Sequence, residues 1–357
     1  MTPELRARAL VSRAWSAGLA PDPVLTVTEW ADKERRLAQS ASPYPGPWRT
    51  DRVPYLREVM DCLSLSAKSV REVTFMKSAQ VAGTEAGINL FGLVACASPA
   101  PMLIVLPTTD EVKKYVKTKL QPAIDATPAL KAAVAAQKSR DEKGSTGAFK
   151  VFPGGFCQIT GANSSSGLQM ISVRVVILEE VSEYPEDVDG RGDPVDQALA
   201  RTKAFTAKRK VFFNSTPGVQ GMCRVSARYE ASDKRVYLVP CPHCGAEQEL
   251  KFENLRWESD TVPHGAYFVC VASGCVIEHH HKRQMLAAGR WHATNPGPGR
   301  QPGFHIWQAY SPFVSWDETV AAWLEAKGKP LKEKVFTQQV QGRAWEAKGE
   351  APDSLKP

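Results

Sequence analysis

Residues 69–97, SVREVTFMKSAQVAGTEAGINLFGLVACA, decide the interpretation of the whole chain. Residues 72–75 alternate polar and apolar side chains, as a half-buried strand does. A loop of small residues, 77–84, comes next, and Glu85 opens a segment whose apolar residues recur at helical spacing. A phosphate-binding loop needs this order of strand, tight loop and helix, because backbone N–H groups then converge at a helix N-terminus that favours anions.

The usual spelling of such a loop, G-x-x-x-x-G-K-[ST], is broken here. Gly83 stands directly before Thr84, where a lysine is expected. The nearest ammonium group belongs to Lys77, at the start of the loop. By itself the loop is therefore a weak indicator of nucleotide binding.

The composition is that of a globular protein. Its 357 residues suggest about two domains, and 43% hydrophobic and 23% charged residues allow a sizeable core. The net charge of +7 is compatible with a nucleic-acid partner without requiring one. The N-terminus has no apolar secretory segment, and prolines interrupt the most apolar run, 88–106, so we expect no membrane association.

Three more apolar runs, 102–106, 173–178 and 211–213, are typical of strands buried on both faces. Segments of helical pattern alternate with them, which indicates βαβ units. One of these, 111–120, carries four lysines and is interpreted as a solvated basic helix. The predicted fold class is α/β, a P-loop NTPase with a mainly parallel sheet and flanking helices, followed by a small zinc-ribbon-like β element.

Polar groups follow two of these strands. Glu179 and Glu180 end the run at 173–178, and an ATPase uses such a pair to hold Mg²⁺ and to polarise the attacking water. Ser215 and Thr216 follow the run at 211–213 and are placed to sense a γ-phosphate. Ligands of open α/β sheets lie at the carboxyl ends of the strands, so these groups are expected beside the loop. The alternative is an ordinary polar strand end in both places.

Four cysteines form a second motif. Cys241 and Cys244 make a C-x2-C pair, and Cys270 and Cys275 make a C-x4-C pair. Four thiolates in two pairs suit a closed tetrahedral Zn²⁺ site of structural type. Because the second pair has a wide spacing, His264 or one of 279–281 remains an alternative ligand, and a cluster without metal is the other alternative.

These features predict four segments. Residues 1–43 form an N-terminal helical arm, 44–238 the P-loop ATPase domain, 239–282 the zinc-ribbon-like segment and 283–357 the start of a truncated nuclease domain.

Seven motifs occur in an order that resembles the GpA-like branch of the large terminase subunits of tailed phages. They are KSAQVAGTEAG at 77–87, GANSSSGL at 161–168, VVILEEVSEYPEDVDGRGDP at 175–194, ARTKAF at 200–205, FFNSTPG at 212–218, CPHCG at 241–245 and FHIWQAYSPFVSW at 304–316. The resemblance runs from about residue 29 to the C-terminus.

The resemblance implies an ATP-driven motor that packs double-stranded DNA into a procapsid in the host cell cytoplasm. It implies ATP and Mg²⁺ as cofactors. The implied partners are the terminase small subunit, the procapsid portal and further copies of the chain. A companion endonuclease cuts concatemeric DNA in this family.

The resemblance also implies roles for single residues. Lys77, Glu179 and Glu180 match catalytic positions, Glu180 as water activator, and Thr84 matches the Mg²⁺ ligand. Ser215 and Thr216 match the coupling motif, Tyr44 an adenine-contacting aromatic and Arg201 a charge-sensing arginine. The remaining cofactor-binding positions are Ser78, Ala79, Gln80, Val81, Ala82, Gly83 and Glu85.

The sequence departs from the family pattern at Glu179, where aspartate is usual, and in its length, since large subunits of this branch continue into a nuclease domain. We find no downstream set of aspartates and glutamates that could hold two metals, which predicts incomplete nuclease function. The alternative function is a catalytically silent DNA- or partner-binding module with a degenerate loop. A helicase-like translocase would need a second motor domain, for which the chain shows no room.

Overall fold

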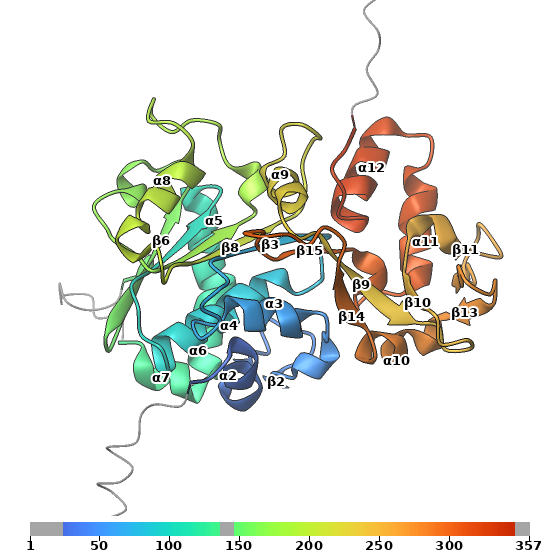
Figure 1. The fold of residues 1–357 in the computed structure, drawn as a ribbon, viewed down its shortest axis with the longest axis horizontal. Coiled ribbons are helices and arrows are strands. Elements are labelled where there is room, and N and C mark those ends of the chain that lie inside the picture. Colours follow the sequence, from blue (N-terminus) through green and yellow to red (C-terminus); the bar gives the residue numbers. More distant parts are fainter. Residues whose placement is uncertain (1–23, 136–145, 347–357) are drawn as a thin grey trace, which may run out of the picture.

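The computed structural model describes residues 24–135 and 146–346. Part of the predicted N-terminal arm therefore lies outside the described residues, namely residues 1–23, as do residues 347–357. A ten-stranded sheet runs through the molecule (Figure 1). Its strands, in spatial order, are β10 (Glu247–Glu249), β9 (Arg235–Pro240), β15 (Gly303–Ile306), β3 (Glu72–Lys77), β8 (Lys210–Ser215), β7 (Val175–Glu179), β4 (Met102–Leu106), β6 (Gly155–Gly161) and β5 (Phe149–Phe152), with β14 (Arg290–Ala293) paired to β9.

Parallel pairing connects all strands from β9 to β6, and only the peripheral strands β5, β10 and β14 pair in antiparallel fashion. The predicted α/β fold with a mainly parallel sheet is confirmed. The expectation of a half-buried strand at 72–75 is wrong, because residues 73–77 of β3 are all buried. Strands β15 and β8 flank β3, and helices pack against it on both faces of the sheet, so no polar face remains.

The helices cover the two faces of the sheet in two groups. Below it in Figure 1 lie α2 (Val27–Glu34), α3 (Leu56–Leu63), α4 (Gly83–Cys96), α6 (Gln121–Ala126) and α7 (Pro128–Ala133), and above it lie α8 (Pro194–Ala200) and α9 (Arg224–Ala231). The helix α5 (Thr109–Tyr115) follows β4 and continues through a π-helical turn, Val116–Leu120, into α6. Alternate side chains of one strand join different cores: Ile104 of β4 packs with the lower group, and its neighbours Leu103 and Val105 with the upper one.

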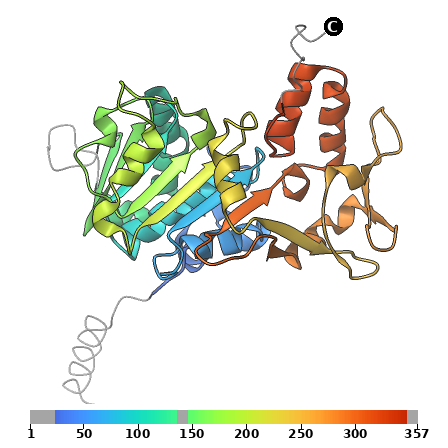
Figure 2. The same cartoon turned by 45° about the horizontal axis from the view of Figure 1, so that its top comes forward.

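The remaining elements gather at one end of the molecule (Figure 2). They are a three-stranded antiparallel sheet of β11 (Leu255–Arg256), β12 (Tyr267–Val269) and β13 (Val276–Glu278), and the helices α10 (Lys282–Ala287), α11 (Trp316–Ala326) and α12 (Pro330–Val335). A second π-helical turn, Phe336–Val340, follows α12. A short ribbon of β1 (Arg36–Leu37) and β2 (Gly46–Pro47) lies beside α6. None of the helices in the described ranges is long and apolar enough to cross a bilayer.

Strand β15 inserts between β3 and β9 in the middle of the main sheet. It comes from the segment 283–357, so residues far apart in the sequence build one sheet. Main-chain bonds extend this connection to the loop after β3, because the Ser78 N–H donates to the Ile306 carbonyl over 3.0 Å. Strand β15 thus helps to position the start of the predicted phosphate loop.

A buried histidine on β15 makes stability depend on pH. His305 is buried and its Nε2 bonds to the Gly342 carbonyl over 3.1 Å. Burial, together with nearby Arg343, lowers the pKa of His305 from 6.5 to about 4. The unfolded chain therefore binds a proton that the folded chain excludes, so stability is complete above about pH 6.5 and declines as the pH falls toward 4.

We expect the free energy of unfolding to fall by about 3 kcal/mol over this window through His305 alone. Urea unfolding at several pH values measures it. His305→Gln keeps a donor for Gly342 but cannot be protonated, so its pH dependence should be shallower. The exposed His292→Gln is the control and should follow the wild type. Equal slopes for His305→Gln and the wild type would contradict this assignment.

Candidate functional site

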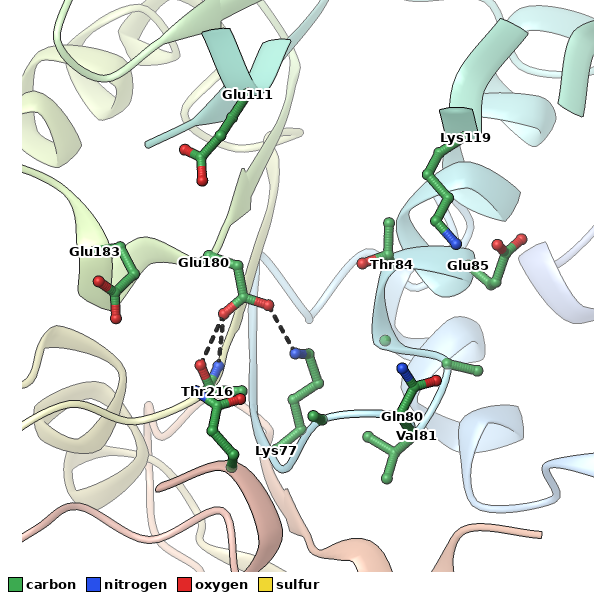
Figure 3. Close-up of a pocket in the computed structure, with 14 residues that line it drawn as sticks. Lys77, Gln80, Val81, Thr84, Glu85, Glu111, Lys119, Glu180, Glu183 and Thr216 are labelled. Atoms are coloured by element: carbon green, nitrogen blue, oxygen red, sulfur yellow. Dashed lines mark hydrogen bonds and ion pairs between the residues drawn. The ribbon is translucent and has the colours of Figure 1, made fainter. Parts of the chain in front are cut away.

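A cavity of about 530 Å³ opens where the carboxyl ends of β3, β7 and β8 meet the N-terminus of α4 (Figure 3). The residues around it come from five parts of the chain. They are Lys77, Ala79, Gln80, Val81, Ala82, Gly83, Thr84, Glu85, Glu111, Lys119, Glu180, Glu183, Thr216 and Gln339. The loop from 77 to 85 thus lies beside Glu180 and Thr216, as the sheet topology predicted.

The backbone of the loop is shaped to receive an anion. Gln80 and Ala82 have left-handed φ values of 58° and 59°. Such residues turn successive N–H groups toward one side, as in phosphate-binding nests. The N–H of Ala79 donates to the Gln339 carbonyl over 2.8 Å, whereas within the described ranges the N–H groups of 80–84 have no acceptor. The free donors therefore lie at the cavity, at the start of α4.

Glu180 connects the loop to the end of β8. Its Oε1 accepts from the Lys77 ammonium over 2.8 Å, and its Oε2 accepts from the N–H and the hydroxyl of Thr216 over 2.9 and 3.0 Å (Figure 3). Burial acts to raise the pKa of Glu180, but Lys77 and Thr216 outweigh it, and the net pKa lies below the usual value. Glu180 is therefore held as a carboxylate.

Glu179 is the buried member of the pair, and α4 covers it. Its Oε2 accepts from the Thr84 hydroxyl over 3.2 Å and from the Asn214 amide over 2.7 Å. Its Oε1 is buried and makes no hydrogen bond in the described part of the chain. Burial and the neighbouring Glu180 carboxylate raise the pKa of Glu179 to about 7, against the opposing effects of Lys77, Asn214 and Thr84.

Two glycines of α4 make room for these side chains. A Cβ atom on Gly83 would lie 2.5 Å from Asn214 Oδ1 and 2.7 Å from Lys77 Cδ. A Cβ atom on Gly87 would lie 2.9 Å from Glu179 Oε1. The space beside position 83 is thus already filled by the Lys77 side chain, so the lysine at 77 and the glycine at 83 are complementary.

Other predicted residues lie outside the cavity. Ser78 is fully buried. Ser215 is also buried, and its hydroxyl oxygen accepts from the Ser182 N–H over 3.2 Å. Arg201 follows α8, and its Nε donates to the Gln197 carbonyl over 3.3 Å. The structure does not bring Ser78, Ser215 or Arg201 to the cavity surface.

Tyr44 lines a second cavity, of about 390 Å³. Its ring lies 5.8 Å from the Phe313 ring and 5.8 Å from the Arg52 guanidinium carbon. The structure therefore does not place Tyr44 on the wall of the cavity at Lys77 and Glu180, and the adenine contact stays a prediction.

Four residues of the cavity wall were missed by the sequence analysis. The sequence predicts a solvated helix that contains Glu111 and Lys119. This prediction is wrong for Lys119, because the Lys119 side chain is half-buried and points into the cavity. Glu183 lies in the motif at 175–194 but received no role there, and Gln339 lies in none of the quoted motifs. Gln339 arrives from more than 250 residues along the chain, a contact that no local pattern reveals.

The four cysteines converge on one point. All four sulfurs lie within 4.8 Å of one another, with 3.4 Å between Cys241 and Cys275 and 3.7 Å between Cys244 and Cys270. These separations are near the roughly 3.8 Å edge of a tetrahedron with metal–sulfur bonds of about 2.3 Å. His264, an alternative ligand, instead bonds to the Ser259 carbonyl over 3.0 Å.

Comparisons with known proteins agree with the α/β fold and identify the family. Residues 42–291 match the family model of the phage terminase large subunit gpA, ATPase domain. Residues 301–356 match that of the terminase large subunit gpA, endonuclease domain.

Two curated relatives are terminase large subunits. That of Enterobacteria phage P21 is 30% identical, over 92% of this chain and 54% of the relative. That of Escherichia phage lambda is 29% identical, over 94% of this chain and 55% of the relative. The chain thus spans about half the length of the curated relatives that it matches.

The crystal structure of the large terminase of bacteriophage HK97 has a similar fold. The TM-score is 0.53 at 13% sequence identity, and the match covers 90% of this chain and 55% of that one. At this identity the likeness concerns the fold alone.

The complementarity of Lys77 and Gly83 leads to a test. We expect Gly83→Lys, which restores the usual lysine, and Gly83→Ala to lower the free energy of unfolding by about 1–3 kcal/mol, because both add atoms to filled space. Urea denaturation measures the loss. Gly147→Ala is the matched control, since a Cβ atom there meets nothing within 4 Å. A Gly83→Lys protein as stable as the wild type would show that the space is not filled by Lys77.

Proposed function

This chain belongs to the gpA family of phage terminase large subunits, and from this premise we propose that it hydrolyses ATP to move double-stranded DNA into a procapsid. The observation that carries the proposal is the contact of Glu180 with both Lys77 and Thr216 at the edge of the cavity. This contact brings together the predicted phosphate loop (Lys77), the predicted water activator (Glu180) and the predicted coupling motif (Thr216).

The residues present fit Mg²⁺. The Thr84 hydroxyl and the Glu179 carboxylate lie together at the start of α4, and Glu179 has a buried oxygen without a partner. Hydroxyl and carboxylate oxygens are the ligands of this hard cation, so Thr84 directly and Glu179 directly or through water would hold it. The ion would neutralise phosphate charge when bound.

The residues of the chain then divide the work. The N–H groups of 80–84 bind the phosphates at the helix N-terminus, and Lys77 adds a positive charge at the end near Glu180. The Glu180 carboxylate orients the attacking water and accepts its proton. Because Thr216 bonds to the same carboxylate, a change at Glu180 reaches the segment after β8 directly.

The site favours a working motor over the silent module. In a degenerate loop, random replacement of the usual lysine would leave a gap or a clash. Here Lys77 fills the space beside Gly83, and Gly87 leaves space for the longer Glu179 side chain. Both departures from the common pattern are compensated within the same site.

We further propose that the chain contacts DNA mainly through its phosphates, so that binding is salt-sensitive and independent of sequence. A procapsid portal, a terminase small subunit and further copies of the chain are the proposed partners, in the cytoplasm of the host. Residues 301–356 match the endonuclease domain of this family, so we propose that this segment begins a nuclease domain.

A structural zinc ion is our second proposal. The tetrahedral spacing of Cys241, Cys244, Cys270 and Cys275 supports it. The ion would connect the turn after β9 with the turn between β12 and β13, a region whose strands are only three residues long. Such short strands bury little surface of their own, so the metal would supply much of the local stability.

The first test measures ATP hydrolysis in the presence of double-stranded DNA. We expect Lys77→Ala and Glu180→Gln each to lower the rate by about 100-fold or more, since they remove a phosphate-binding charge and the group that accepts the proton. The exposed variants Lys114→Ala and Glu186→Gln are controls and should retain the wild-type rate. If the wild type and both site variants hydrolyse ATP equally poorly, the motor function is wrong for this chain.

The second test measures bound metal and melting. We expect about one zinc ion per chain, its loss in Cys244→Ser, and a lower melting temperature after chelation with EDTA. Cys96→Ser, at the end of α4 and far along the chain from the cluster, should keep the metal. Purified protein without stoichiometric zinc, whose melting EDTA leaves unchanged, would rule out the metal site.

A further inference from the structure

Lys119 projects into the cavity from the side opposite Lys77. In Figure 3 its side chain reaches toward Thr84 and Glu85, whereas Lys77 and Glu180 lie across the loop. Lys119 is half-buried, and within the described ranges its ammonium makes no hydrogen bond or ion pair. A cation held in a cavity without a partner is a candidate ligand for an anion.

The π-helical turn explains why Lys119 faces the cavity. In the helix that begins at Thr109, the buried positions Val112 and Tyr115 are followed by Leu120, five residues further on, across the turn at 116–120. The wide turn keeps Leu120 in the hydrophobic core and rotates the residues before it, so that Lys117 is exposed and Lys119 lines the cavity. Single π-helical turns inside helices frequently occur at functional sites.

The other charged side chains that line the cavity either form ion pairs or are carboxylates. Lys77 is bound to Glu180, and Glu85 is bound to Arg35 over 3.0 Å. Glu111 and Glu183 add two more carboxylates to the wall. A polyphosphate entering this cavity needs positive charge away from Glu180, and Lys119 is the cavity-lining cation of the described residues that remains unpaired.

We propose that Lys119 binds the phosphate chain of the nucleotide at the end nearer the nucleoside, beside Glu85. The inference rests on the proposed ATPase function. Glu180 marks the end at which water attacks, so Lys77 serves the terminal phosphate. Lys119, on the other side of the loop, contacts the phosphates that ATP and ADP share. It replaces part of the charge that the usual loop lysine would provide.

Equilibrium binding of ATP, ADP and adenosine to the whole chain tests this assignment. We expect Lys119→Met, which keeps the aliphatic length, to weaken ATP and ADP about tenfold each, because one charge-assisted contact is lost. Adenosine, which has no phosphate, should bind as it does to the wild type. Lys119→Arg should retain most of the affinity, and Lys117→Met, on the same turn but exposed, should retain all of it.

The outcomes separate this inference from the function on which it rests. If the wild type binds ATP and Lys119→Met binds ATP and ADP equally well, Lys119 is not a phosphate ligand, and the ATPase proposal stands. An equal loss for adenosine would indicate a collapsed site and would also overturn the assignment. If the wild type itself does not bind ATP, both proposals fail together.

Discussion

The contact of Lys77 with Glu180 ties together three strands that are distant in the sequence. Lys77 ends β3, Glu180 follows β7, and Thr216, the second partner of Glu180, follows β8. Parallel pairing places these ends at one edge of the sheet, and the ion pair fixes their side chains relative to one another. Removing one charge would leave the other partly buried without compensation, so the three elements depend on each other.

The same contact explains the unusual composition of the loop. Once the lysine comes from position 77, its aliphatic part crosses the first turn of α4, and only glycine fits at 83. Similarly, the glutamate at 179 is accommodated because position 87 has no side chain. Each departure from the usual motif is thus compensated by a residue at another position. A comparison made one position at a time would interpret the same departures as loss of the motif.

The segment that matches the endonuclease model helps to build the cavity at Lys77 and Glu180. Strand β15 pairs with β3, the Gln339 carbonyl accepts from the loop residue Ala79, and the Trp345 N–H donates to the Gly218 carbonyl over 3.0 Å. Residues 336–345 therefore bond both to the predicted phosphate loop and to the chain just beyond Thr216. These hydrogen bonds form a direct physical connection between the loop at the cavity and the segment 336–345.

The sequence by itself determined the α/β class, the apolar strands and the polar residues that follow them, among them Glu180 and Thr216. Apolar runs and the polar groups directly after them are local features of the sequence. It also predicted that the four cysteines form one cluster, because the spacing within each pair is a local feature. Only the tertiary structure decided that β15 lies inside the main sheet, that Tyr44 lies on another cavity and that Lys119 and Gln339 reach the loop. These contacts join distant segments or depend on a π-helical turn that shifts the register of a helix, and periodicity along the chain contains no information about either.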